Sequence, residues 1–278
     1  MIRKPAKSLA AALGAAAAVV FLPLGPAPHA QGGDPPLRIR LGYDGRLLVK
    51  VLDIEIEQQV TRSGFSSSAR LISTGILRLF KHIDERAVSQ GHIAGGDPRP
   101  WVFDYQRLAS KTHRRVKVTW TPSDVVMTTN VPFPSMGDPP PTLEQKLGAA
   151  DPLTQLLRIT LDGDRPDVCR RSYMFFDGRQ LYALDFSNRR EADASSTEDR
   201  LGLTRHFRCD VRFREVAGYG KKPPEKRDQG LKKPVAVDIS EVGDTGLWVI
   251  SKMQAPTPLG YAVIELKRLS VRGDDPTA

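Results

Sequence analysis

Apolar and polar residues alternate along much of the chain with a period of two, which is typical of strands with one buried and one solvated face. From Leu48 to Val60 the even positions are mostly Leu, Ile and Val, whereas Asp53, Glu55 and Glu57 fall on the other face. A strand of that length would span roughly 45 Å, which is long for a sandwich and typical of curled sheets. The same alternation around Cys209 places Phe207, Val211 and Phe213 inward and His206, Arg208, Asp210, Arg212 and Arg214 outward.

Further short runs separated by Gly, Ser and Pro predict an antiparallel meander. The fold prediction is mainly β: a single curled antiparallel sheet, a half-barrel or open barrel of about 11–13 strands, with one or two short helices. Residues 76–83 fit a helix or a strand equally well. The predicted strands are 48–60, 65–71, 87–93, 101–108, 112–121, 124–131, a strand through Cys169 and on to Phe176, 181–184, 206–214, 235–239, 247–253 and 261–269.

One helix and one hairpin have clear local signals. Asp151 is expected to cap a helix that starts at Pro152 and carries leucines on one face, either for core packing or to close the mouth of the curled sheet. Asp177-Gly178 is expected to form a type I′ turn between two apolar strands. Three segments are expected to be loops: 132–141, which has five prolines, 188–199, and the basic stretch 221–234.

The first thirty residues have the plan of a secretory signal peptide: three basic residues, then a 16-residue apolar run that is short for a membrane span. An uncleaved anchor is the alternative. We therefore predict a signal peptide at 1–30 and a single β-rich periplasmic domain at 31–278, which does not span the membrane after cleavage. Removing residues 1–30 lowers the net charge from +9 to +6.

Export changes the interpretation of Cys169 and Cys209, the two cysteines of the chain. An oxidising compartment favours a disulfide between them, worth roughly 4 kcal/mol at most in the chain-entropy model. Two buried free thiols are the alternative. A metal pair is disfavoured because no histidine lies at ligand spacing from either cysteine.

Motifs for catalysis, cofactors and metals are missing from the sequence, so we predict a protein that is not an enzyme and has no cofactor. His82 with Asp84, and His92 with Asp97, are weak metal candidates. Asp53, Glu55 and Glu57 are the candidate carboxylates for a glycosidase, with a solvated strand face as the alternative. The candidate anion-binding surface is Arg208, Arg212, Arg214, Lys221 and Lys222, and simple solubilisation of an exposed strand is its alternative. Nucleic acid is not expected as a partner, because no basic motif interleaved with aromatics supports it.

The order of several motifs resembles a proteobacterial periplasmic family, domain-of-unknown-function family 3108. The resemblance covers most of the chain after residue 30. It implies export and a curled sheet similar to the lipoprotein-carrier half-barrels, and it implies no activity. The matching pieces are Asp151-Pro152-Leu153, Cys169, Phe176-Asp177-Gly178-Arg179 with Leu181-Tyr182, Cys209 and Val216-Ala217-Gly218-Tyr219, with weaker matches at Ser73-Thr74-Gly75 and 257–260.

These observations predict a non-enzymatic protein of the cell envelope. Its curled sheet would bind a lipid or another amphipathic ligand, an envelope protein or an anionic envelope polymer. Tyr173, Phe175, Phe207 and Phe213 would face the concavity or the core. A hydrolase acting on an envelope polymer through carboxylates, and a purely structural assembly factor, are the alternatives.

Overall fold

The computed structural model describes residues 36–109, 112–162, 168–220, 233–257 and 260–273. All of them belong to one compact unit, Asp34–Ala278. The predicted signal peptide at 1–30 lies outside the described residues, as do Lys221, Lys222 and most of the basic stretch 221–234.

The described residues form thirteen strands in one antiparallel sheet, whose order is β7-β6-β5-β4-β3-β2-β1-β13-β12-β11-β10-β9-β8. Two meanders thus meet where the first strand pairs with the last. The strands are β1 (Leu37–Arg46), β2 (Lys50–Val60), β3 (Gly64–Ser73), β4 (Asp84–Ala94), β5 (Asp97–Arg107), β6 (Arg115–Trp120), β7 (Val125–Thr129), β8 (Ser172–Phe176), β9 (Leu181–Glu191), β10 (Leu203–Ala217), β11 (Val235–Val242), β12 (Trp248–Thr257) and β13 (Gly260–Arg272).

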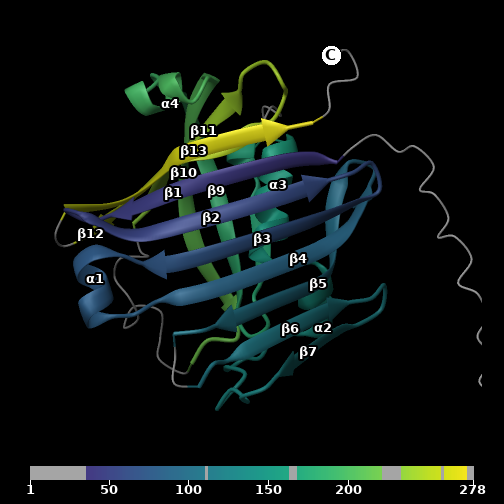
Figure 1. The fold of residues 1–278 in the computed structure, drawn as a ribbon. Helices are drawn as coiled ribbons and strands as arrows, with labels where there is room; N and C mark the ends of the chain where they lie inside the picture. Colours follow the sequence, from purple (N-terminus) through teal and green to yellow (C-terminus); the bar gives the residue numbers. More distant parts are fainter. Residues whose placement is uncertain (1–35, 110–111, 163–167, 221–232, 258–259, 274–278) are drawn as a thin grey trace, which may run out of the picture. The chain divides into compact units, whose positions relative to one another are not determined.

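The sheet curls around its longest helix. Helix α3 (Pro152–Asp162) packs against β3, β4 and β5 of the first meander and against β8 and β12 of the second. Figure 1 shows β1 to β5 in front, with α3, β9 and β10 behind them. The predicted mainly β, curled antiparallel fold is confirmed. The described residues hold four short α-helices rather than one or two; the others are α1 (Gly75–Phe80), α2 (Leu143–Leu147) and α4 (Ser196–Arg200).

The edge strands β7 and β8 do not pair with each other, so the sheet is not closed into a barrel. Side chains from both edges nevertheless share one core cluster, which includes Val116 and Val118 of β6 and Phe176 and Leu181 of the β8–β9 hairpin. Gly178 at the tip of that hairpin lies so close to β6 that a Cβ atom there would collide with Val116. Packed side chains therefore bridge the gap that backbone hydrogen bonds leave open.

The first long strand begins later than predicted. The prediction placed Leu48 inside, but β2 starts at Lys50 and Leu48 is 84% exposed. Residues 37–46, which the sequence left without an assignment, form β1 and pair with both β2 and β13. Leu47, Leu48 and Val49 therefore occupy the turn between two strands.

Three local predictions are wrong around the cysteine-bracketed hairpin. Cys169 lies in a 3₁₀ turn (Val168–Arg170) before β8, not in a strand. The turn after β8 spans four residues rather than two, because Phe176 pairs with Leu181. Within this turn the Asp177 carboxylate accepts hydrogen bonds from the amides of Arg179 and Gln180. The predicted loop at 188–199 instead continues β9 to Glu191 and then forms α4.

The strand predicted at 112–121 starts only at Arg115, as β6, but other local predictions hold. Residues 132–141 form neither helix nor strand, and the ambiguous segment after Ser73 is helical as α1. Asp151 caps α3 through its Oδ1 atom, which accepts hydrogen bonds from the amides of Leu153 (2.9 Å) and Thr154 (3.1 Å). Helix α3 serves core packing, since Leu153, Leu157 and Ile159 are buried.

Candidate functional site

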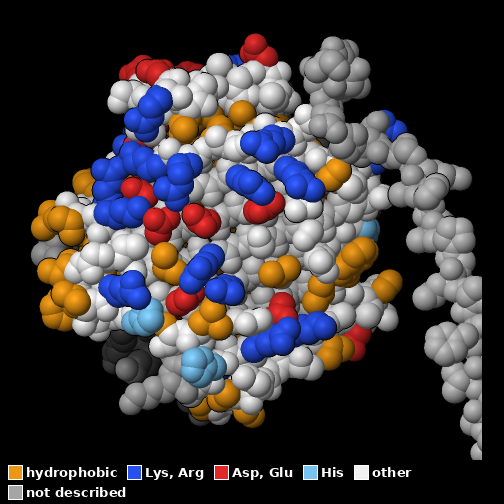
Figure 2. Space-filling view, in the orientation of Figure 1, with side chains coloured by type: hydrophobic (Ala, Val, Ile, Leu, Met, Phe, Trp, Pro, Cys, Tyr) orange, Lys and Arg blue, Asp and Glu red, His pale blue; other side chains and the backbone are white. Residues whose placement is uncertain are grey.

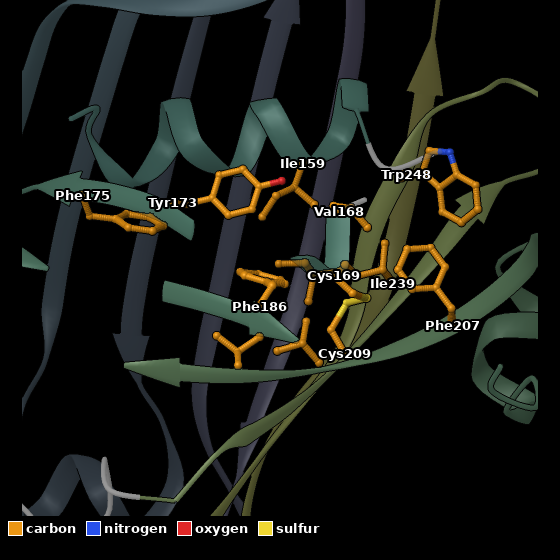
Figure 3. Packing of buried hydrophobic residues seen from close by; sticks show 13 residues of the cluster. Ile159, Val168, Cys169, Tyr173, Phe175, Phe186, Phe207, Cys209, Ile239 and Trp248 are labelled. Atoms are coloured by element: carbon orange, nitrogen blue, oxygen red, sulfur yellow. A yellow bond between two sulfur atoms is a disulfide. The ribbon is translucent and has the colours of Figure 1, made fainter. Parts of the chain in front are cut away.

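The predicted disulfide is confirmed. Cys169 and Cys209 are bonded, and both are fully buried in the largest core cluster. Figure 3 shows the bond among Phe186, Phe207 and Ile239. Its place in the core ties the turn before edge strand β8 to the middle of β10, so its role is architectural.

The concave face of the sheet, where a ligand was expected, is occupied by side chains and by α3. Tyr173, Phe175 and Phe207 are buried in the core, and Phe213 lies against Tyr182 with ring centroids 5.2 Å apart. Tyr173, Phe175 and Phe207 belong to the same core cluster as the disulfide. The other candidate residues lie on the outside of the sheet.

The arginines of the candidate anion-binding surface lie on the outer side of β10, as predicted, but two of them have acidic partners on neighbouring strands. Arg208 donates two hydrogen bonds to Asp238 of β11, and Arg214 donates two to Asp185 of β9. Arg212 is exposed and has no ion pair among the described residues. The acidic partners offset much of the positive charge that β10 alone suggests.

The candidate carboxylates lie on the outer face of β2 among cations. Asp53 forms ion pairs with Lys50 (2.8 Å) and Arg268 (3.1 Å); burial opposes its ionisation, yet these cations hold its pKa below the usual value. Glu55 and Glu57 line an open hollow of about 620 Å³ together with four arginines: Arg40, Arg70, Arg86 and Arg268. A general acid needs a raised pKa, whereas the pKa of Asp53 is lowered.

The histidine–aspartate pairs do not assemble a metal site. Asp84 forms an ion pair with Arg70 (3.0 Å). His92 and Asp97 both line a second hollow, separate from the one beside Glu55 and Glu57. No third ligand joins them, and the described ranges hold no group of three potential metal ligands.

An exposed apolar surface that the sequence did not predict lies at one end of β1 to β4. We call it the apolar tip; it comprises the turn residues Leu47, Leu48 and Val49 and the α1 residues Ile76, Leu79 and Phe80. Leu48, Leu79 and Phe80 are more than four-fifths exposed. Hydrophobic side chains gather at the left edge of Figure 2, where Figure 1 places α1 beside the strand ends.

A backbone hydrogen bond and a close backbone contact hold the two parts of the apolar tip, the β1–β2 turn and α1, next to each other. The Thr74 amide, just before α1, donates a hydrogen bond to the Val51 carbonyl at the start of β2 (2.9 Å). Gly75 approaches the Lys50 carbonyl closely and has a positive φ of 54°. The chain thus enters α1 directly beside the β1–β2 turn, and no residue of α1 is buried.

Cations surround the apolar tip. Arg78 and Lys81 are exposed, and neither has an ion-pair partner among the described residues. Nearer the sheet, Lys50 is paired with Asp44 and Asp53, and Arg46 with Glu265. The acidic groups close to the tip are therefore already neutralised.

Among the described residues, no helix is both long and apolar enough to cross a bilayer. Neither a protein-family model nor a curated protein matches the chain, so the resemblance to family 3108 is not shown. A solved structure, the beta-barrel-like protein of domain of unknown function DUF1849 from Brucella abortus, aligns at a TM-score of 0.47 and 8% identity. That alignment covers 87% of this chain and 100% of the other. These comparisons assign no activity to the chain.

Proposed function

We propose that this protein is a non-enzymatic component of the cell envelope that docks its apolar tip onto an anionic phospholipid surface. The observation that carries the proposal is the cluster of six exposed, large apolar side chains beside Arg78 and Lys81, which have no acidic partner in the part of the chain that the structure describes. In this proposal the predicted amphipathic ligand is a lipid, and it contacts the outside of the sheet rather than the concavity.

The apolar part of the contact follows from the hydrophobic effect. A contiguous exposed apolar patch on a folded domain often marks an interaction surface, whereas single scattered apolar residues do not. Moving a Leu or Phe side chain from water into an apolar environment gains about 1.5–3 kcal/mol when burial is complete. Leu48, Leu79 and Phe80 can enter a bilayer interface with almost all of their side-chain surface, because so little of it touches the protein.

The charged part selects anionic lipid. A Lys or Arg near an anionic membrane surface contributes about 1 kcal/mol of attraction. Arg78 and Lys81 lie on and next to α1, so they can reach phosphate groups while Leu79 and Phe80 enter the boundary between headgroups and acyl chains. Binding is therefore expected to need both the apolar side chains and an anionic headgroup.

The periplasmic location is supported by the signal-peptide pattern of residues 1–30 and by the disulfide, which is a feature of oxidising compartments. An envelope protein with an apolar groove is the main competing partner for the same tip. A hydrolase that uses Asp53, Glu55 and Glu57 has less support, because arginine and lysine side chains surround them.

Vesicle flotation of protein purified from the periplasm tests the proposal. We expect the protein to float with vesicles of phosphatidylglycerol and phosphatidylcholine, and much less with phosphatidylcholine alone. The double variant Leu79→Asp/Phe80→Asp should bind at least about tenfold more weakly, the equivalent of 1.4 kcal/mol. Val126→Asp is the matched control, because Val126 is 48% exposed on edge strand β7, away from the tip.

Two results would contradict membrane docking. One is a wild-type protein that stays with the soluble fraction at every lipid composition. The other is a tip variant that floats as well as Val126→Asp does. Stable capture of an envelope protein by the wild type but not by the tip variant, without flotation, would favour the competing partner.

A further inference from the structure

We propose that a second site, at the opposite end of β3 and β4 from the apolar tip, binds a pyranose unit that carries a carboxylate, as part of a glycan chain. The site is a hollow of about 520 Å³, which we call the tryptophan pocket; the residues that matter here are Arg99, Trp101, Trp120, Pro122, Leu147 and Arg158. Its volume lies in the range of ordinary small-molecule sites.

The position of the pocket follows from the register of the sheet. Gly64 pairs with His92 at the pocket end of β3 and β4, and Ile72 pairs with Asp84 at the apolar end. The eight-residue separation corresponds to about 27 Å along a strand. A ligand in the pocket therefore would not touch the apolar tip, and this proposal does not depend on membrane docking.

Two tryptophans give the pocket flat apolar surfaces. Trp120 is almost buried and held in place, because its Nε1 donates to the Lys146 carbonyl (3.3 Å) and its ring meets Phe176 edge-on at 6.5 Å. Trp101 is 49% exposed and lies near the His92 ring, with centroids 6.3 Å apart. An indole combines an apolar face with an N–H donor, which suits the C–H face of a sugar ring whose hydroxyls remain in water.

Charge in the pocket favours an acidic ligand. One carboxylate oxygen of Asp97 accepts a hydrogen bond from the Nε of Arg158 (2.8 Å). The other oxygen accepts a hydrogen bond from the Nε of Arg99 (3.4 Å). Two guanidinium groups therefore share one carboxylate, which leaves one positive charge unbalanced. Arginine binds a carboxylate through two parallel hydrogen bonds.

Arg158 is oriented before any ligand arrives. Besides Asp97, it donates Nε to the Pro98 carbonyl (3.1 Å) and Nη1 to the Gln155 side chain (3.1 Å). Its Nη2 has no acceptor among the described residues, so this nitrogen is available to a bound anion. A purely hydrocarbon ligand would have to desolvate these charged groups without pairing them, which is costly.

A nucleic-acid strand fits the pocket less well than an acidic sugar does. Binding of a single strand needs successive stacking rings along a basic groove. Here Trp101 is half-exposed whereas Trp120 forms part of the floor, and Asp97 lies between the two arginines. A single sugar ring that carries one carboxylate matches both the shape of the pocket and its one excess positive charge.

A matched pair of disaccharides tests the assignment. The acidic probe is N-acetylglucosaminyl-N-acetylmuramic acid, and the neutral probe is chitobiose, which has a similar backbone without the carboxylate. With the full protein, titration followed by tryptophan fluorescence and calorimetry should show the acidic probe binding at least about tenfold more tightly. Trp101→Ala should lose binding and Trp101→Phe should retain most of it.

The arginine variants test the charge. Arg99→Gln and Arg158→Gln should each reduce the preference for the acidic probe, and Arg99→Gln keeps the assignment testable if the half-buried Arg158 proves necessary for folding. Tyr261→Ala, an exposed aromatic on β13, should bind like the wild type. Equal binding of the two disaccharides, no binding of either, an equal effect of Tyr261→Ala, or tighter binding of a 12-residue oligothymidylate would each overturn the proposal.

Discussion

The hydroxyl of Ser89 on β4 donates a 2.8 Å hydrogen bond to the Asp151 carboxylate, which also caps helix α3. The same carboxylate oxygen accepts a 2.5 Å hydrogen bond from Thr154, and all three side chains are buried. One residue therefore starts the helix and fastens it to the first meander of the sheet. The place of α3 inside the curl depends on this contact.

Replacing Asp151 with alanine should destabilise the protein by about 2–4 kcal/mol. The change removes a helix cap and the acceptor that the buried hydroxyls of Ser89 and Thr154 share. These hydroxyls lie 3.0 Å apart, so one can still donate to the other, and the second donor is left unpaired. Asp151→Asn should cost less, because the amide oxygen can still accept the two backbone amides. Urea unfolding measures both values, and equal stability of the alanine variant and the wild type would show that α3 is held in another way.

Gly178 tests how the two edges of the sheet meet. Gly178→Ala should cost more than Gly202→Ala, because both glycines have positive φ but only the Cβ at position 178 would collide with β6. The backbone penalty is about 1–2 kcal/mol at either position, and overpacking adds about 1–3 kcal/mol at Gly178. Thermal unfolding compares the two, and an equal loss at both positions would mean that the hairpin does not pack on β6.

Acid should weaken the outer face of β9 and β10. A hydrogen bond from Arg214 holds the pKa of Asp185 below its usual value, and one from Arg190 does the same for Asp210. A carboxyl whose pKa is lower in the folded state stabilises the protein above its unfolded pKa of about 3.9, and this contribution is lost as pH falls through the folded pKa. Both pairs are largely solvated, so their joint contribution to stability is small.

The double variant Asp185→Asn/Asp210→Asn should therefore be less stable than the wild type at pH 7, and the difference should shrink below about pH 4. Chemical unfolding from pH 7 to pH 2 measures this convergence. Asp244→Asn is the control, because Asp244 is exposed and has no ion pair among the described residues. A constant difference at all pH values would contradict the assigned ion pairs.

Sequence reasoning succeeded where the signal is local. The cap at Asp151, the inward alternation around Cys209 and the curled antiparallel sheet follow from neighbouring residues and were predicted correctly. The disulfide followed from cysteine number and the expected compartment. The pairing of β1 with β13 joins residues more than 200 positions apart, and no local pattern indicates it.

The candidate sites were harder to predict because they depend on register and on exposed residues. Asp238 and Asp185 face Arg208 and Arg214 from other strands, so β10 by itself overstated the positive charge. Alternation also cannot distinguish the end of a strand from an apolar turn, which is why Leu48 was placed inside. Leu48, which departs from the predicted alternation, belongs to the apolar tip that we propose binds lipid.

The most direct test of membrane docking is to ask whether the apolar tip enters the bilayer. A tryptophan introduced as Phe80→Trp should add an emission component that brominated phosphatidylglycerol quenches on vesicle binding. Val126→Trp, on the far edge strand, should add a component that the same lipid does not quench. The account predicts selective quenching at position 80; equal quenching at both positions, or none at position 80, would contradict it.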